Sequence, residues 1–81
     1  MLKKIKTAIE DCSLEPLNSN TAYMKLFCGL AYKHSIVSNK EVAVFLGISP
    51  SSVSYYRKEH NNMLAVTEYL HLYEKVEGKI L

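Results

Sequence analysis

Apolar residues recur along this chain at spacings of three and four, which is the period of an amphipathic α-helix. The pattern predicts helices over residues 2–12 and 21–34, two shorter helices between residues 38 and 60, and a last helix from about residue 63 to residue 80. No alternating run is long enough to predict a strand with equal force. We therefore expect an all-α fold, with about five helices forming a small bundle.

The segments between these helices carry turn and capping residues. Pro16 disfavours helix at the residue before it, and the run from Asn18 to Thr21 offers caps for the second helix. Gly29 lies inside that helix, where it costs roughly 1 kcal/mol relative to alanine, so we expect another helix to cross closely there. The pair Asn61-Asn62 weakens the pattern and predicts a kink or a helix boundary.

The segment from Ser38 to His60 has the residue order of a helix, a tight turn and a second helix. Ser38 can cap the first helix, and Gly47 can adopt the positive φ that ends it. Ser49 is a second N-cap, and Pro50 stands at the first helical position, where its missing N–H costs nothing. This order is typical of a helix-turn-helix, whose second helix enters the major groove of DNA.

Counted from Asn39, the segment also matches the general helix-turn-helix residue pattern. Ala43 is the small residue where the two helices would touch, and Gly47 is the turn glycine. Apolar residues fill the expected buried positions, which are Val42, Leu46, Ile48, Val53 and Tyr56. The order of elements over residues 20–81 resembles the C-terminal DNA-binding domain of the DnaA replication initiator, which has a Trp-repressor-like fold. The resemblance implies a helical domain that binds duplex DNA through the helix starting near Ser49.

The sequence departs from that family at the signature of its DNA-binding helix. DnaA proteins carry Arg-Asp-His-Ser-Thr-Val there, whereas Ile48, Ser49 and Pro50 stand in the first three positions of this chain. Recognition of the initiator's own sites is therefore not implied. A phosphate-binding loop of the G-x-x-x-x-G-K-[ST] kind is also missing. We expect a single helical domain over residues 1–81 that acts as a stand-alone regulator or mobile-element protein. In it, residues 1–19 form an N-terminal helix and linker, and residues 20–81 form the core.

The candidate DNA contacts lie on the outward face of the second helix of the pair. Serine hydroxyls and the free N–H groups of a helix N-terminus suit phosphate oxygens, an exposed tyrosine can reach a groove, and cations can meet the backbone. The predicted contact residues are Ser49, Ser51, Ser52, Ser54, Tyr55, Arg57 and Lys58. Of these, Ser51, Ser54, Tyr55 and Lys58 are the candidates for base-edge or groove contacts. Alternatively, the serines only cap the helix and the charged pair forms a solvated face.

The charge of the chain gives DNA binding little electrostatic support. The net charge is +2, and residues 1–40 net +3 while residues 41–81 net −1. Phosphate neutralisation supplies most sequence-independent affinity, so one copy should bind duplex DNA weakly and two copies more usefully. A homodimer is an open alternative, with a seam on the last helix made from Leu64, Tyr69, Leu72 and Leu81. A protein–protein interaction module with the same fold is the alternative function.

Other chemistry finds no support in the sequence. Cys12 and Cys28 form no CxxC motif and are interpreted as reduced thiols of a cytoplasmic protein. His34, His60 and His71 lack zinc-finger or HExxH spacing, so we expect no metal and no cofactor. We expect His60 to be placed favourably at a helix C-terminus. The serines lack a GxSxG context, which argues against an enzyme. No apolar run approaches the ~18 residues of a membrane span.

Overall fold

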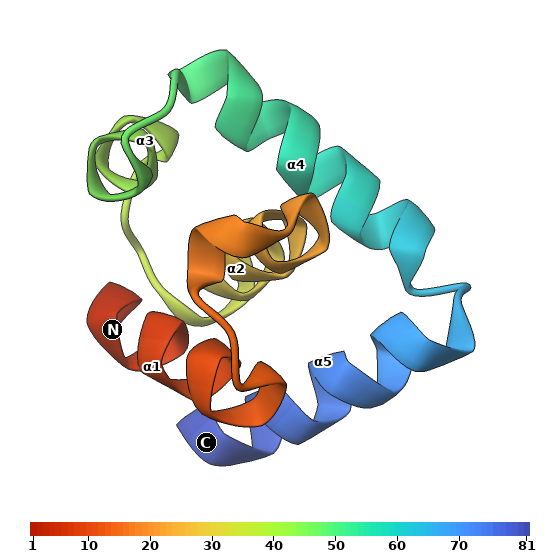
Figure 1. Cartoon of the computed structure of the whole chain (residues 1–81). Coiled ribbons are helices and arrows are strands. Elements are labelled where there is room, and N and C mark those ends of the chain that lie inside the picture. Colours follow the sequence, from red (N-terminus) through yellow and green to blue (C-terminus); the bar gives the residue numbers. More distant parts are fainter.

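Five α-helices and one short 3₁₀ helix make up the regular structure of the chain, which contains no strand (Figure 1). The computed structural model describes all 81 residues. The elements are α1 (Leu2–Ser13), η1 (Leu17–Ser19), α2 (Thr21–His34), α3 (Asn39–Leu46), α4 (Pro50–Met63) and α5 (Thr67–Ile80). The all-α prediction and its count of helices are confirmed, and α2 has the predicted bounds.

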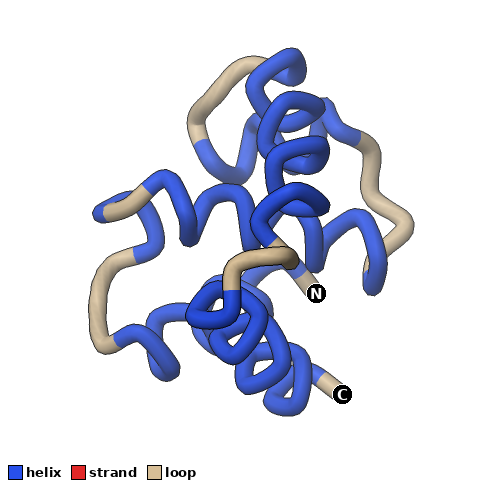
Figure 2. The backbone as a smooth tube through the Cα atoms, turned by 90° about the vertical axis from the view of Figure 1, so that its right-hand side faces the viewer, coloured by secondary structure: helices blue, strands red, loops and turns tan.

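The helix α2 lies at the centre of the bundle, with the other four helices around it (Figure 1). Its buried residues are Met24, Leu26, Phe27, Cys28, Gly29, Leu30 and Ala31. The helices α1 and α5 pack against each other on one side of α2, and the two chain termini lie on the same side of the molecule (Figure 2). Because two short helices cannot bury their apolar faces alone, α2 provides the surface on which α3 and α4 fold.

The crossing of α2 and α4 is close enough to require glycine. A Cβ atom added to Gly29 would overlap the imidazole ring of His60 on α4. The predicted close approach at Gly29 is therefore confirmed, and the crossing helix is α4.

His60 lies in the last turn of α4, as predicted, but it does not act there as a charged surface group. His60 is only 6% exposed, and its Nδ1 lies 2.6 Å from the Tyr69 hydroxyl, with which it shares a hydrogen bond. Burial lowers the pKa of His60, and the Lys33 ammonium lowers it further, whereas Glu77 opposes the shift. His60 is thus a neutral core residue that joins α4 to α5.

The burial of His60 predicts a pH-dependent stability. Because its pKa is lower in the folded than in the unfolded chain, the unfolded chain binds more protons at mildly acidic pH. We expect the free energy of unfolding to hold above about pH 6.5 and to fall as the pH drops below that value. Urea unfolding across this range measures the slope. The slope should flatten in His60→Gln and persist in His71→Gln, a change at an exposed histidine. Equal slopes in the two variants would contradict this role.

A polar cluster joins the end of α2 to α5. The Lys33 ammonium and the His34 imidazole each lie 2.7 Å from the Glu77 carboxylate, and the Tyr73 hydroxyl donates to the same carboxylate at 3.0 Å. Hydrogen bonding from Lys33 is the main cause that lowers the pKa of Glu77 to about 2, and bonds from His34 and Tyr73 add to it. This cluster helps to hold α5 beside α2.

The predicted start of the last helix is wrong by about four residues. The helix α4 continues through Asn61 and Asn62 to Met63, and the chain turns over Leu64–Val66 before α5 begins. The asparagine side chains point to solvent, and Asn62 Nδ2 donates to Glu59 at 3.1 Å. They therefore do not compete with the helical backbone, which asparagine otherwise tends to disrupt.

The helix α5 has no exposed apolar seam. Tyr69, Val76 and Ile80 are buried, and Leu64 and Leu72 pack against the same core. Of the residues expected at a dimer seam, only Leu81 is exposed. None of the helices combines the length and the apolar character needed to cross a lipid bilayer.

Candidate nucleic-acid interface

Local capping chemistry fixes the α3–turn–α4 unit, which we define as residues 39–63. The Ser38 hydroxyl accepts from the Glu41 N–H at 3.2 Å and starts α3. At the other end Gly47 has a φ of 71°, and the Ile48 N–H donates to Ala43 O at 3.0 Å, as in a Schellman motif. The Ser49 hydroxyl then accepts from the Ser52 N–H at 3.2 Å and starts α4. All four predicted cap and turn residues, Ser38, Gly47, Ser49 and Pro50, are confirmed.

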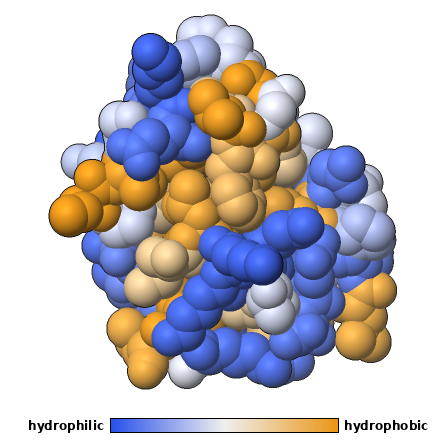
Figure 3. All heavy atoms as spheres, turned by 90° about the vertical axis from the view of Figure 1, so that its left-hand side faces the viewer, coloured by the Kyte–Doolittle hydropathy of each residue, from blue (hydrophilic) through white to orange (hydrophobic).

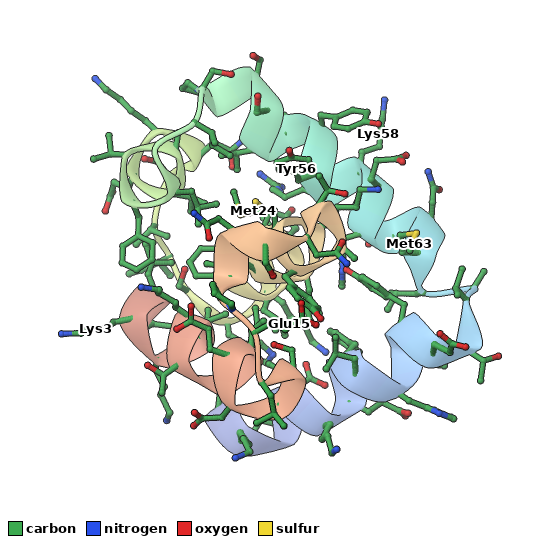
Figure 4. All side chains as sticks on the ribbon, in the orientation of Figure 1. Lys3, Glu15, Met24, Tyr56, Lys58 and Met63 are labelled. Atoms are coloured by element: carbon green, nitrogen blue, oxygen red, sulfur yellow. The ribbon has the colours of Figure 1, made fainter.

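On the inward side of the α3–turn–α4 unit, α4 packs on α2 and α3 packs mainly on α4. Val42, Ala43 and Val53 are buried, and three further predicted core residues, Leu46, Ile48 and Tyr56, are half-buried against the core. Figure 4 shows Tyr56 on the inner side of α4, toward α2, and Lys58 pointing away from the bundle. The outward face of α4 is thereby fixed by the packing of its inner face.

Three serine hydroxyls gather at the N-terminus of α4. Ser49 Oγ lies 3.0 Å from Ser51 Oγ and 2.9 Å from Ser52 Oγ. Ser49 and Ser51 are exposed, whereas Ser52 is half-buried. The first turn of α4 holds no acidic residue, so the partial positive charge of the helix N-terminus is not neutralised by a neighbouring carboxylate. This end of the helix can accept an anionic oxygen.

A hydrogen-bonded bridge links the start of α3 to the middle of α4. Asn39 Nδ2 donates to Ser54 Oγ at 2.9 Å, and Arg57 Nη1 donates to Asn39 Oδ1 at 2.6 Å. The Arg57 guanidinium also lies 3.5 Å from the centre of the Tyr32 ring, a cation–π contact with α2. Arg57 is therefore half-buried and held in place, rather than a freely moving surface cation.

Sequence reasoning missed Asn39 and Tyr32 as partners of this face. Asn39 is the first residue of α3 and Tyr32 lies in the last turns of α2, and neither position carries a motif. The helical pattern does place Tyr32 off the apolar stripe of α2, but only the fold brings it beside Arg57.

Tyr55 and Lys58 are the exposed large side chains of the α4 face. The Tyr55 ring is about half-exposed and lies 5.8 Å from the Tyr56 ring, tilted by 53°. Lys58 is exposed and has no carboxylate within ion-pair distance. The first carboxylate of α4 is that of Glu59, which lies 3.8 Å from the Lys25 ammonium. Residues 49–58 therefore carry two cations and no carboxylate.

The seven predicted contact residues thus share one helix and its cap. Five of them, Ser49, Ser51, Ser54, Tyr55 and Lys58, are exposed, and two, Ser52 and Arg57, are half-buried. The arrangement offers hydroxyls at the helix start, a polar and aromatic middle, and cations toward the helix end. These are the groups that contact phosphates and base edges in protein–DNA complexes.

The remaining reactive side chains take part in packing. Cys12 and Cys28 are free thiols, and burial raises the pKa of Cys28 to about 12, which keeps it protonated. His34 and His60 are engaged with Glu77 and Tyr69. No group of three or more histidine, cysteine, aspartate and glutamate side chains is arranged to hold a metal ion.

Comparison of the chain with protein-family models, with curated proteins and with solved structures found no match. What the α3–turn–α4 unit does must therefore be inferred from its own residues and geometry. The resemblance to the DnaA C-terminal domain stays a prediction.

Proposed function

We propose that this protein binds duplex DNA sequence-specifically by placing α4 in the major groove, and that it acts as a small regulator of transcription or replication. One observation carries the proposal. From Ser49 to Lys58, α4 presents hydroxyls, an exposed tyrosine, the exposed cation Lys58 and the half-buried Arg57, without any carboxylate that would repel phosphates. The outward face of a surface helix commonly carries charged and polar residues, and over residues 49–58 the charged ones are all positive.

Each part of this face has a distinct role in the proposal. The N-terminus of α4, with Ser49, Ser51 and Ser52, would position the helix against a phosphate. Ser54 and Tyr55 would reach base edges or thymine methyl groups in the groove. Lys58 would neutralise a phosphate, and Arg57, fixed by its contacts with Asn39 and Tyr32, would meet the backbone with little loss of side-chain entropy.

The class of domain is part of the proposal. The helix bounds, the left-handed Gly47 and the buried small residue Ala43 all agree with the residue pattern of a helix-turn-helix. The resemblance to the DnaA C-terminal and Trp-repressor-like domains supports the same class. Ile48, Ser49 and Pro50 differ from the initiator signature, so the target sequence is not expected to be the initiator's.

The proposal predicts a salt-dependent affinity for DNA. With two phosphates neutralised per copy, by Arg57 and Lys58, log affinity should fall with log salt with a slope of about −1.8 per bound copy. That slope corresponds to a loss of about tenfold between 50 and 200 mM salt. Fluorescence anisotropy of a labelled random-sequence duplex measures it. Folded protein that binds no duplex even at the lower salt concentration would refute DNA binding.

A protein-interaction module is the second candidate function, and one observation favours it. Ile36, in the linker before α3, and Val44, on α3, are strongly exposed. Large exposed apolar side chains that lie together commonly mark a protein-binding surface. A protein bound at Ile36 and Val44 would leave α4 free to bind DNA, because these two residues lie in the linker before α3 and on α3, not on the outward face of α4.

A further inference from the structure

One side of the molecule carries an exposed apolar surface, which we call the apolar face. It consists of Met1 and Leu2 at the start of α1, Ile36 in the linker before α3, and Val44 and Phe45 on α3. Ile36 is fully exposed, Val44 is 77% exposed, and Met1 and Phe45 are about half-exposed. Figure 3 looks at this side and shows several hydrophobic residues at the surface, with hydrophilic residues around them. Such a face is costly to leave in water.

The apolar face has both a hollow and a projection. A shallow, open groove of about 420 Å³ lies between Leu2 on α1 and the exposed side of α3, where Val44 and Phe45 line it together with Lys40 and Glu41. The Phe45 ring that forms its wall is stacked on Phe27 of α2, with ring centres 5.5 Å apart. This stack holds the Phe45 side of the groove against α2.

Ile36 is the projecting part of the same face. It follows the end of α2, and with Met1 and Val37 it borders a second hollow that adjoins the first through Met1 and Leu2. Val37 packs on the core, which leaves Ile36 directed outward from a linker that is anchored on both sides. A projecting isoleucine beside an apolar groove gives this face a shape that can fit a copy of itself.

The groove of the apolar face is lined by one charge of each sign. Lys40 and Glu41 are adjacent on α3, both exposed, and neither forms an ion pair within the chain. In a dimer with twofold symmetry, if residue i of one copy contacts residue j of the other, then residue j of the first copy also contacts residue i of the second. Two copies can therefore form two Lys40–Glu41 pairs, whereas a partner of one charge sign would meet one repulsive residue.

We propose that the apolar face binds a second copy of this chain about a twofold axis. Ile36 of each copy enters the groove of the other, and Lys40 of each copy pairs with Glu41 of the other. This inference goes beyond DNA binding and does not depend on it. If both hold, two α4 helices act together, which offsets the small number of cations on each.

Sedimentation equilibrium in the absence of DNA tests the dimer. The wild-type chain should approach twice the monomer mass as its concentration is raised, and Ile36→Asp should weaken association about tenfold or more. Because Ile36 is fully exposed, this change leaves the fold intact. Leu81→Asp is the matched control, since Leu81 is 82% exposed but lies at the end of α5, and it should associate as the wild type does.

Charge exchange on α3 tests the pairing. Lys40→Glu and Glu41→Lys should each weaken association, and the double variant should restore it. A wild-type chain that stays monomeric at every concentration overturns the proposal, and so does an Ile36→Asp variant that associates as strongly as the wild type. DNA binding by the monomeric Ile36→Asp variant is measured separately, so a failed dimer and a failed DNA interaction give different results.

Discussion

Replacing Gly29 with alanine is expected to destabilise the fold by about 2 kcal/mol or more. The added methyl group would overlap the His60 ring, which cannot rotate away without losing its hydrogen bond to Tyr69. The ring is also flanked by Tyr73, whose centre lies 5.3 Å from its own. The α2–α4 crossing would have to widen, and the loss exceeds the roughly 1 kcal/mol that alanine gains over glycine inside a helix. Thermal or urea unfolding measures the difference.

Gly78 provides the matched control for this change. It lies in α5, where an added Cβ would meet nothing within 4 Å. Gly78→Ala should therefore stabilise the protein by up to about 1 kcal/mol, since only the helix propensity changes. The two glycine-to-alanine changes should thus have opposite signs.

A double-mutant cycle with His60→Ala isolates the cause. Gly29→Ala should cost much less in the His60→Ala background, because the ring that it would strike is gone. Equal costs in both backgrounds would show that the crossing at Gly29 does not depend on His60.

The features of the fold that follow from local chemistry could be predicted from the sequence. Ser38, Gly47, Ser49 and Pro50 determine the ends of α3 and α4 through bonds that span three to five residues. The apolar period of three and four likewise predicts α2 with its observed bounds. Such signals are carried by neighbouring residues and do not depend on how the helices are later arranged.

Features that depend on distant partners could not be predicted. Asn61 and Asn62 are typical of a helix boundary, yet α4 continues through them because His60 is buried and Met63 packs against the core. His60 itself has the sequence position of a surface cation, and it is a neutral core residue because the folded chain buries its ring among Gly29, Tyr69 and Tyr73.

In the candidate DNA-contact site, too, some features follow from neighbouring residues and others depend on distant partners. The helical period places Ser51, Ser54, Tyr55 and Lys58 on the outward face, and the structure has all four exposed there. The contacts of Arg57 could not be predicted in this way, because its partners Asn39 and Tyr32 come from two other helices and are 18 and 25 positions away in the chain. No local pattern connects them.

Replacing Lys58 with glutamate is expected to weaken binding to duplex DNA about tenfold or more at low salt. The change turns an exposed, unpaired cation on the α4 face into a carboxylate that would oppose the phosphates. It should also reduce the steepness of the salt dependence, because one fewer phosphate is neutralised. Lys58 makes no hydrogen bond or ion pair within the chain, so the stability of the fold should hardly change.

Lys75→Glu is the control that separates the face from the overall charge. Lys75 is also exposed and unpaired, but it lies on α5, and its replacement changes the net charge by the same two units. The most direct measurement is an anisotropy titration of one duplex with the wild type and these two variants at equal salt. DNA binding through α4 predicts a large loss for Lys58→Glu and nearly wild-type affinity for Lys75→Glu. Equal losses in both variants, or a larger loss for Lys75→Glu, would contradict it.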